Sequence, residues 1–199
     1  MKVTAILPTR GRPELASRAL ACVLMQTWTP FQIVIVDDLQ SPSFPRWQES
    51  GFEEKGLHYL RVNEPELGNK LNLACSLASG EYIVHFHDDD WSAPGRIEDQ
   101  ITRLIASGKA VTTYRNLVYT DGARRWINRN WPGGFGTSLC HRRDWSDGHN
   151  FPAIESEDWY FVSAAMRANQ HVAGDAGSLM LVRLTANAKV GANWEEIAC

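Results

Sequence analysis

The stretch GEYIVHFHDDDW, residues 80–91, guides the interpretation of the whole sequence. Tyr82, Ile83 and Val84 form a short apolar run typical of a buried strand, and three consecutive aspartates follow it at residues 88–90. Adjacent carboxylates repel and raise one another's pKa. A solvated strand end does not need three of them, so we expect this cluster to hold a ligand.

Similar apolar runs occur on both sides of this stretch. We expect strands at residues 3–7, 33–36, 57–62 and 81–86. We expect helices that begin at Pro13, at Asn69 and at Pro94. Apolar strands that alternate with amphipathic helices predict an α/β fold with a mainly parallel central sheet flanked by helices. The Pro- and Gly-containing segment 41–56 predicts a loop with a short helix near residues 46–54.

The alternation ends near residue 110. The sequence that follows predicts a small, partly antiparallel C-terminal half, with strand-like residues 110–119, a turn at 121–122, a loop at 131–136, a strand at 138–141 and a helix at 157–169. With 199 residues and 44% hydrophobic composition, the chain is expected to form a single domain over residues 1–199, with its two halves meeting near residue 108.

Charge and composition exclude several classes of partner. The net charge of −3 gives no electrostatic case for nucleic acid. No apolar run approaches the ~18 residues of a transmembrane segment, and the N-terminal run is too short for a signal peptide. The four cysteines show no CxxC pairing. These features predict a reduced, cytoplasmic protein.

Polar residues follow three of the predicted strands. Thr9 and Arg10 follow the first, Asp37 and Asp38 end the second, and the three aspartates follow the fourth. Ligands of parallel sheets bind at the carboxyl ends of the strands. The sequence therefore predicts a binding site at that edge.

Three roles are open for the aspartate cluster. In the first, one of its aspartates, or Ser92, simply caps the helix that begins at Pro94. His85, His87 and Asp89 match the start of a zinc-hydrolase motif, HxHxDH, although Asp90 replaces its last histidine. Alternatively, the aspartates supply the oxygen ligands that Mg²⁺ or Mn²⁺ shares with a diphosphate.

An ordered set of motifs over residues 3–183 resembles glycosyltransferase family 2. The set comprises PTRGRPELASRAL, QIVIVDD and LGNKLNLACSLASGEYIVHFHDDDW, followed by the pair Glu157 and Asp158. The resemblance implies a GT-A fold, with a nucleotide-binding half to about residue 108 and an acceptor and donor-sugar half beyond it. It also implies an inverting, metal-dependent enzyme that moves a sugar from a nucleotide-diphosphate donor, most often a UDP sugar, to an acceptor hydroxyl.

The resemblance also implies roles for individual residues. The donor would be bound by Thr9, Arg10, Asp37, Asp38, Lys70, Asn72 and Asp88. Mn²⁺ or Mg²⁺ would be held by Asp89 with Asp90 and His87. Asp158 would be the catalytic base, with Glu157 beside it. The sugar or acceptor would meet Trp91, Trp131, Gly133, Gly134 and Trp159.

The sequence departs from the family pattern at several positions, of which two bear on the metal and the phosphates. His87 stands where many members have the first aspartate of the metal motif, and Leu71 replaces a frequent arginine. An inactive relative that binds a nucleotide sugar is therefore the first alternative, and the zinc hydrolase is a more distant one. The sequence leaves the acceptor unspecified, whether glycan, lipid-linked or protein.

Overall fold

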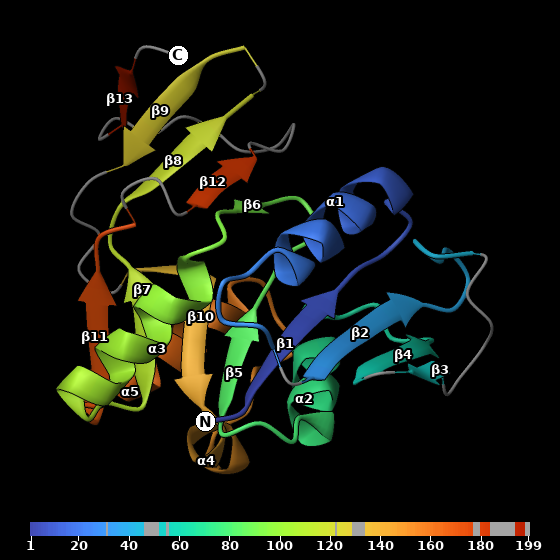
Figure 1. Cartoon of the computed structure of the whole chain (residues 1–199), viewed down its shortest axis with the longest axis horizontal. Helices are drawn as coiled ribbons and strands as arrows, with labels where there is room; N and C mark the ends of the chain where they lie inside the picture. Colours follow the sequence, from blue (N-terminus) through green and yellow to red (C-terminus); the bar gives the residue numbers. More distant parts are fainter. Residues whose placement is uncertain are drawn as a thin grey trace.

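The structure is a computed structural model. It describes the chain except for residues 31, 46–51, 55, 122, 129–133, 177–179, 184–193 and 198–199. Thirteen strands and five helices are assigned within the described part, in two sheets (Figure 1).

The N-terminal half forms most of the large sheet. Its parallel strands lie in the order β5 (Tyr82–His85), β1 (Val3–Pro8), β2 (Gln32–Asp38) and β4 (Leu57–Val62). The connecting helices are α1 (Pro13–Leu24), α2 (Leu67–Leu77) and α3 (Arg96–Ser107). This alternation confirms the predicted α/β class and its mainly parallel sheet.

The C-terminal half extends the same sheet. The strands β10 (Phe135–Arg142), β7 (Val111–Tyr114) and β11 (His171–Gly174) follow β5 in that order, and β10 runs antiparallel to both neighbours. The short strand β3 (Phe52–Glu54) closes the opposite edge. Two helices, α4 (Arg143–Gly148) and α5 (Glu157–Arg167), follow β10.

A small second sheet lies at one end of the molecule, beside the C-terminus (Figure 1). Its order is β13 (Trp194–Ile197), β9 (Arg125–Asn128), β8 (Leu117–Thr120), β12 (Met180–Arg183) and β6 (Trp91–Ser92). All of its pairs are antiparallel except β8 with β12. Because β6 directly follows the aspartate cluster, the second sheet begins beside the predicted site.

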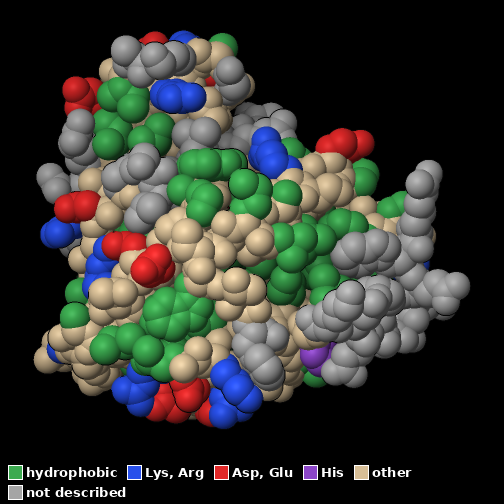
Figure 2. Space-filling model, viewed as in Figure 1, with side chains coloured by type: hydrophobic (Ala, Val, Ile, Leu, Met, Phe, Trp, Pro, Cys, Tyr) green, Lys and Arg blue, Asp and Glu red, His purple; other side chains and the backbone are tan. Residues whose placement is uncertain are grey.

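The two faces of the large sheet bury separate sets of apolar side chains. On β1, Ala5 and Leu7 pack with α1 and α3, whereas Ile6 packs with α2 and α5. All residues of β1 and β2 are buried, as expected for parallel strands covered by helices on both sides. On the face seen in Figure 2, acidic and basic side chains are interspersed.

Four predicted elements need correction. Residues 110–119 form two strands, β7 and β8, which lie on either side of Arg115 and Asn116 and pair with partners in different sheets. Residues 52–54, predicted as the end of a helix, form strand β3, and the rest of that prediction at 46–51 lies outside the described residues. The second helix begins at residue 67 instead of Asn69, and the third begins at residue 96 instead of Pro94.

Two further observations concern the loop at 131–136 and the membrane. The end of that predicted loop, from Phe135, already belongs to β10. None of the helices in the described part of the chain has the length and apolar character needed to cross a bilayer.

Candidate active site

The carboxyl ends of β1, β2 and β5 are joined by hydrogen bonds around Thr9. The Thr9 hydroxyl donates to Asp88 Oδ2 at 2.7 Å, and its oxygen also lies 2.7 Å from the Ser43 hydroxyl. Because the Thr9 proton goes to Asp88, Ser43 acts as the donor to Thr9. Thr9 and Asp88 are 3% and 2% exposed, so this junction is a rigid base for the site.

Asp37 shapes the loop that follows β2. Its carboxylate accepts hydrogen bonds from the backbone N–H groups of Asp38, Ser43 and Phe44, and from the Tyr59 hydroxyl at 2.8 Å. It is fully buried. Four donors saturate this carboxylate, so Asp37 holds the loop in place and leaves Asp38 to face a ligand.

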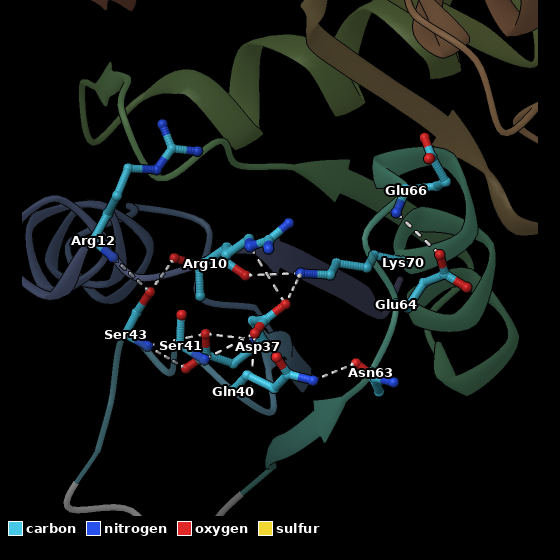
Figure 3. Close-up of polar contacts among 12 residues, drawn as sticks. Arg10, Arg12, Asp37, Gln40, Ser41, Ser43, Asn63, Glu64, Glu66 and Lys70 are labelled. Carbon is cyan, nitrogen blue, oxygen red and sulfur yellow. Dashed lines mark hydrogen bonds and ion pairs between the residues drawn. The ribbon is translucent and has the colours of Figure 1, made fainter.

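Asp38 lies between two cationic side chains. Its Oδ2 is 3.5 Å from Arg10 Nε and 4.0 Å from Lys70 Nζ, and Lys70 also donates to the Thr9 carbonyl at 3.2 Å. Figure 3 shows Lys70 reaching from α2 toward Arg10, whereas Arg12 points away from both.

Burial and charge act in opposite directions on this pair. Burial alone would raise the pKa of Asp38, but the N–H groups of Ser41 and Gln40, with Arg10 and Lys70, hold it below its ordinary value. Burial lowers the pKa of Lys70, and Asp38 opposes that change. The pair therefore presents a fixed carboxylate beside a partly desolvated ammonium.

The three aspartates point in different directions. Arg12 contacts Asp88 Oδ1 at 3.0 Å and Asp89 Oδ2 at 3.1 Å, and Arg18 donates to the Asp89 carbonyl at 3.2 Å. Asp90 turns to the other side and accepts a hydrogen bond from Thr137 of β10. Burial raises the pKa of Asp88, and it raises that of Asp90 to about 6.

The predicted metal ligands do not form a ready-made set. Across the described residues, the group of three His, Cys, Asp or Glu ligand atoms found within 4.8 Å of one another is Cys75, His85 and His141. His87, Asp89 and Asp90 are not brought together in this way, because successive residues of the turn point apart. Asp88 and Asp89 fit a hard divalent cation better, since both carboxylates already converge on one cationic group.

The zinc-hydrolase alternative requires His85, His87 and Asp89 to share one ion. Instead, His85 is 1% exposed and faces His141 on the neighbouring strand β10, whereas the Asp89 side chain is 19% exposed and pairs with Arg12. The structure therefore contradicts this alternative.

Asp158 lies at the start of α5 and rests on β10. A Cβ atom added to Gly136 would overlap its carboxylate, so glycine is required for this approach. Ser156, before the helix, has a φ of 64°, a strained backbone value for a non-glycine residue. Glu157 is 8% exposed, and burial raises its pKa, with Asp158 adding to the effect.

Asp90 and Asp158 approach adjacent residues of β10, Thr137 and Gly136. Burial raises the pKa of Tyr119 on β8, and the charges of Asp90 and Asp158 raise it further. His87 offsets part of the rise that burial causes in the pKa values of Asp90 and Glu157. These groups form a second acidic cluster, separate from the one around Asp38.

Other predicted residues lie elsewhere. Asn72 exchanges two 2.8 Å hydrogen bonds with the backbone of Phe151 and so joins α2 to the chain before α5. Gly134, with a φ of 65°, packs on Thr113. Trp91 and Trp159 are 39% and 41% exposed. Trp131 and Gly133 lie outside the described residues.

Sequence reasoning missed Arg12, Ser43, Thr137 and Tyr119. Arg12 had a usable signal, since it lies in the same strand-end loop as Thr9 and Arg10. Single hydroxyl residues such as Ser43 and Thr137 have no distinctive spacing, so only the fold reveals them.

The chain resembles known proteins in both sequence and fold. It is 32% identical over 123 residues to a putative colanic acid biosynthesis glycosyl transferase, WcaA, of Escherichia coli K12, a match that covers 60% of this chain and 42% of that protein. It is 25% identical over 130 residues to the E. coli UDP-Glc:alpha-D-GlcNAc-diphosphoundecaprenol beta-1,3-glucosyltransferase WfgD, covering 64% and 47%. The chain thus spans less than half the length of these relatives.

Solved structures share its architecture. S. aureus TarS 1-349 in complex with UDP-GlcNAc superposes with a TM-score of 0.75 at 17% identity, over 96% of this chain and 62% of that one. The mannosyltransferase PcManGT of Pyrobaculum calidifontis, in complex with GDP-Man and Mn²⁺, gives 0.69 at 17% identity, over 92% and 56%. These neighbours confirm the predicted GT-A fold.

The sequence model of the family "Glycosyl transferase family 2" matches residues 4–189, which is nearly the whole chain. Together with the strand-end cluster around Thr9 and Asp38, this match confirms the predicted resemblance. The chain belongs to glycosyl transferase family 2.

Proposed function

We propose that this protein is an inverting, metal-dependent glycosyltransferase that uses a UDP sugar. The observation that carries the proposal is the junction of three strand ends, where Thr9, Asp38, Lys70 and Asp88 form one buried network. Such an edge of a parallel sheet is where nucleotides bind. WfgD is named for UDP-Glc, and TarS was solved with UDP-GlcNAc, which favours UDP over other nucleotides.

In this proposal, Asp38 and Thr9 bind the nucleoside and Lys70 faces the diphosphate. A lysine that burial and neighbouring charges fix in one position is suited to a phosphate, because it forms charge-assisted hydrogen bonds. Arg10 contacts Asp38 from the solvent side, and its side chain is 56% exposed.

Mn²⁺ or Mg²⁺ would be held by Asp89 together with Asp88. When bound, the ion neutralises the charge that develops on the departing diphosphate. Arg12 contacts both carboxylates, so it must share them with the ion or move aside. His87 and Asp90 lie toward the second cluster and would act on the sugar side.

Asp158 would be the general base. It accepts the proton of the acceptor hydroxyl as that oxygen attacks the anomeric carbon from the face opposite the diphosphate. One carboxylate would be enough, because a bound ion would stabilise the leaving group in place of a general acid. Trp91 and Trp159, both exposed, would border the acceptor.

The acceptor's class is open, and the lipid-linked acceptor in the name of WfgD is one candidate. We also propose that residues 1–199 act as one domain, since apolar residues of both halves share one core cluster. A cytoplasmic location is supported by the free, buried cysteines Cys22, Cys75 and Cys140.

The proposal is tested by calorimetric titration of the protein with UDP, GDP and dTDP, each with Mn²⁺, with Mg²⁺ and with EDTA. We expect metal-dependent binding of UDP. Binding of GDP instead, the nucleotide in the PcManGT complex, would change the donor class. Binding of UDP with no transfer to any acceptor would favour the inactive relative.

A further inference from the structure

A buried cluster of a thiol and two imidazoles lies beneath the strands of the candidate site. Cys75 comes from α2, His85 from β5 and His141 from β10. His85 Nε2 is 3.0 Å from His141 Nε2, which is 4.0 Å from Cys75 Sγ. The two histidines are 1% and 0% exposed, and Cys75 is 8% exposed.

We propose that Cys75, His85 and His141 form a binding site for a zinc-class divalent metal ion. Their three ligand atoms lie within 4.8 Å of one another. In a tetrahedral zinc site, two nitrogens are about 3.3 Å apart, and a nitrogen and a sulfur are about 3.6 Å apart. The two spacings from His141 Nε2, 3.0 Å to His85 and 4.0 Å to Cys75, differ from these values by a few tenths of an ångström, and the third pair lies within 4.8 Å.

The hydrogen bond of His141 favours this role. Its Nδ1 lies 2.9 Å from the carbonyl oxygen of Arg142, which can only accept, so Nδ1 carries the proton. The lone pair is therefore on Nε2, the atom that faces His85 and Cys75. An imidazole fixed by a carbonyl on one nitrogen and open on the other is the usual form of a metal-ligating histidine.

The protonation state of His141 agrees with metal binding, whereas Cys75 must lose its proton when the ion binds. Burial lowers the pKa of His141 to about 4, so the ring is neutral at physiological pH, as a ligand must be. Burial raises the pKa of Cys75 to about 12, so without metal the thiol keeps its proton. Because His141 Nε2 can only accept, His85 Nε2 carries the proton between the two rings when no metal is bound. Metal binding therefore releases one proton from Cys75 and moves the His85 proton from Nε2 to Nδ1. The divalent ion with one thiolate and two neutral imidazoles then has a net charge of +1.

The Cys75 side of the cluster borders a cavity. Cys75 lines a surface cavity of about 240 Å³, together with Asn72, Ser76, Ser146, Asp147, His149 and Asn150. The fourth position of the ion would face this polar cavity and take a water molecule. The negative charge of Asp147 acts on Cys75 and favours a cation there.

The ion would have a structural effect on the candidate active site. It would link α2 to two strands, of which β5 leads into the aspartates and β10 carries Gly136 and Thr137. The cluster is distinct from Asp88 and Asp89, which offer only oxygen ligands. The inference therefore does not depend on the proposed glycosyl transfer.

The test uses the full chain without a histidine tag. We expect close to one zinc per chain by elemental analysis after purification without chelators. We expect the metal-free protein to develop a thiolate-to-cobalt charge-transfer band with Co²⁺. The band should be lost in Cys75→Ser and His141→Gln. It should persist in Cys22→Ser, whose cysteine is equally buried at 7% exposure, and in Asp89→Ala.

Folded wild-type protein that binds no zinc and gives no cobalt band would overturn the inference, and so would a band that survives Cys75→Ser. If that variant does not fold, thiol modification of the wild type decides. Zn²⁺ should slow labelling of Cys75 at least tenfold, as located by mass spectrometry, and a chelator should restore it. Equal labelling rates with and without Zn²⁺ would refute the site.

Discussion

The guanidinium of Arg12 lies 3.1 Å from the carboxylate of Asp89, the residue that we assign to the metal. The same group contacts Asp88 at 3.0 Å. A cationic side chain thus occupies the surroundings in which a divalent ion would bind. Arg12 and the ion should compete for these carboxylates in the absence of donor.

Arg12→Gln should therefore bind Mn²⁺ more tightly than the wild type when no nucleotide is present. The Arg12 side chain is 45% exposed, so we expect a gain of about two- to fivefold, the range of a solvent-screened ion pair. Titration of Mn²⁺ followed by electron paramagnetic resonance measures the affinity. Arg142→Gln, which removes a similarly exposed arginine paired with Asp144, should leave it unchanged. Weaker binding by Arg12→Gln would contradict the competition.

Asp158→Asn should abolish transfer while donor binding stays within about twofold. The amide cannot accept the acceptor's proton, and loss of a general base costs about 10²- to 10⁴-fold in rate. Turnover with a UDP sugar and calorimetric UDP affinity separate the two effects. Asp175→Asn, an exposed aspartate paired with Arg115, is the control and should retain full activity. Normal turnover by Asp158→Asn would remove the base assignment.

Gly136→Ala should reduce transfer strongly, because the added methyl group would meet the Asp158 carboxylate. We expect a loss of at least tenfold in kcat, with a smaller change in UDP affinity. Gly148→Ala is a matched control, since a Cβ atom there has nothing within 4 Å. Steady-state kinetics and thermal unfolding of both variants provide the measurement. Equal activity of the two would show that Asp158 does not need this close approach.

Stability should decrease as the pH falls from about 6.5 to about 4, partly because of His171. Burial lowers the pKa of His171 to about 4, and its Nε2 lies 2.8 Å from Thr113 Oγ1. Between these pH values the unfolded chain binds more protons than the folded one, so acid favours unfolding. Protonation of this half-buried ring should lower the free energy of unfolding by about 1–2 kcal/mol between neutral pH and about pH 4.

Urea unfolding of the wild type and His171→Gln at pH 7 and pH 5 checks this value. The variant should show a smaller decrease in unfolding free energy between the two pH values. Part of the decrease should remain, because His85 and His141 also have lowered pKa values. An unchanged pH dependence in the variant would exclude His171 as a contributor.

Local chemistry made much of the fold predictable. The apolar runs that became β1, β2, β4 and β5 are each bounded by polar residues, prolines or glycines, and Pro13 is the first residue of α1 as predicted. Sequence periodicity could not reveal that residues 110–119 divide between two sheets. That division depends on which strand each half pairs with, and such partners are distant in the chain.

The sequence by itself determined the parallel α/β core, the edge at which polar residues gather and the family pattern, because these follow from local hydrophobic periodicity and strand-end chemistry. Only the tertiary structure decided where each acidic side chain points. Asp88, Asp89 and Asp90 are adjacent in sequence, yet they meet Thr9, Arg12 and Thr137 respectively. A turn directs neighbouring side chains apart, and their partners come from segments up to 79 residues away along the chain.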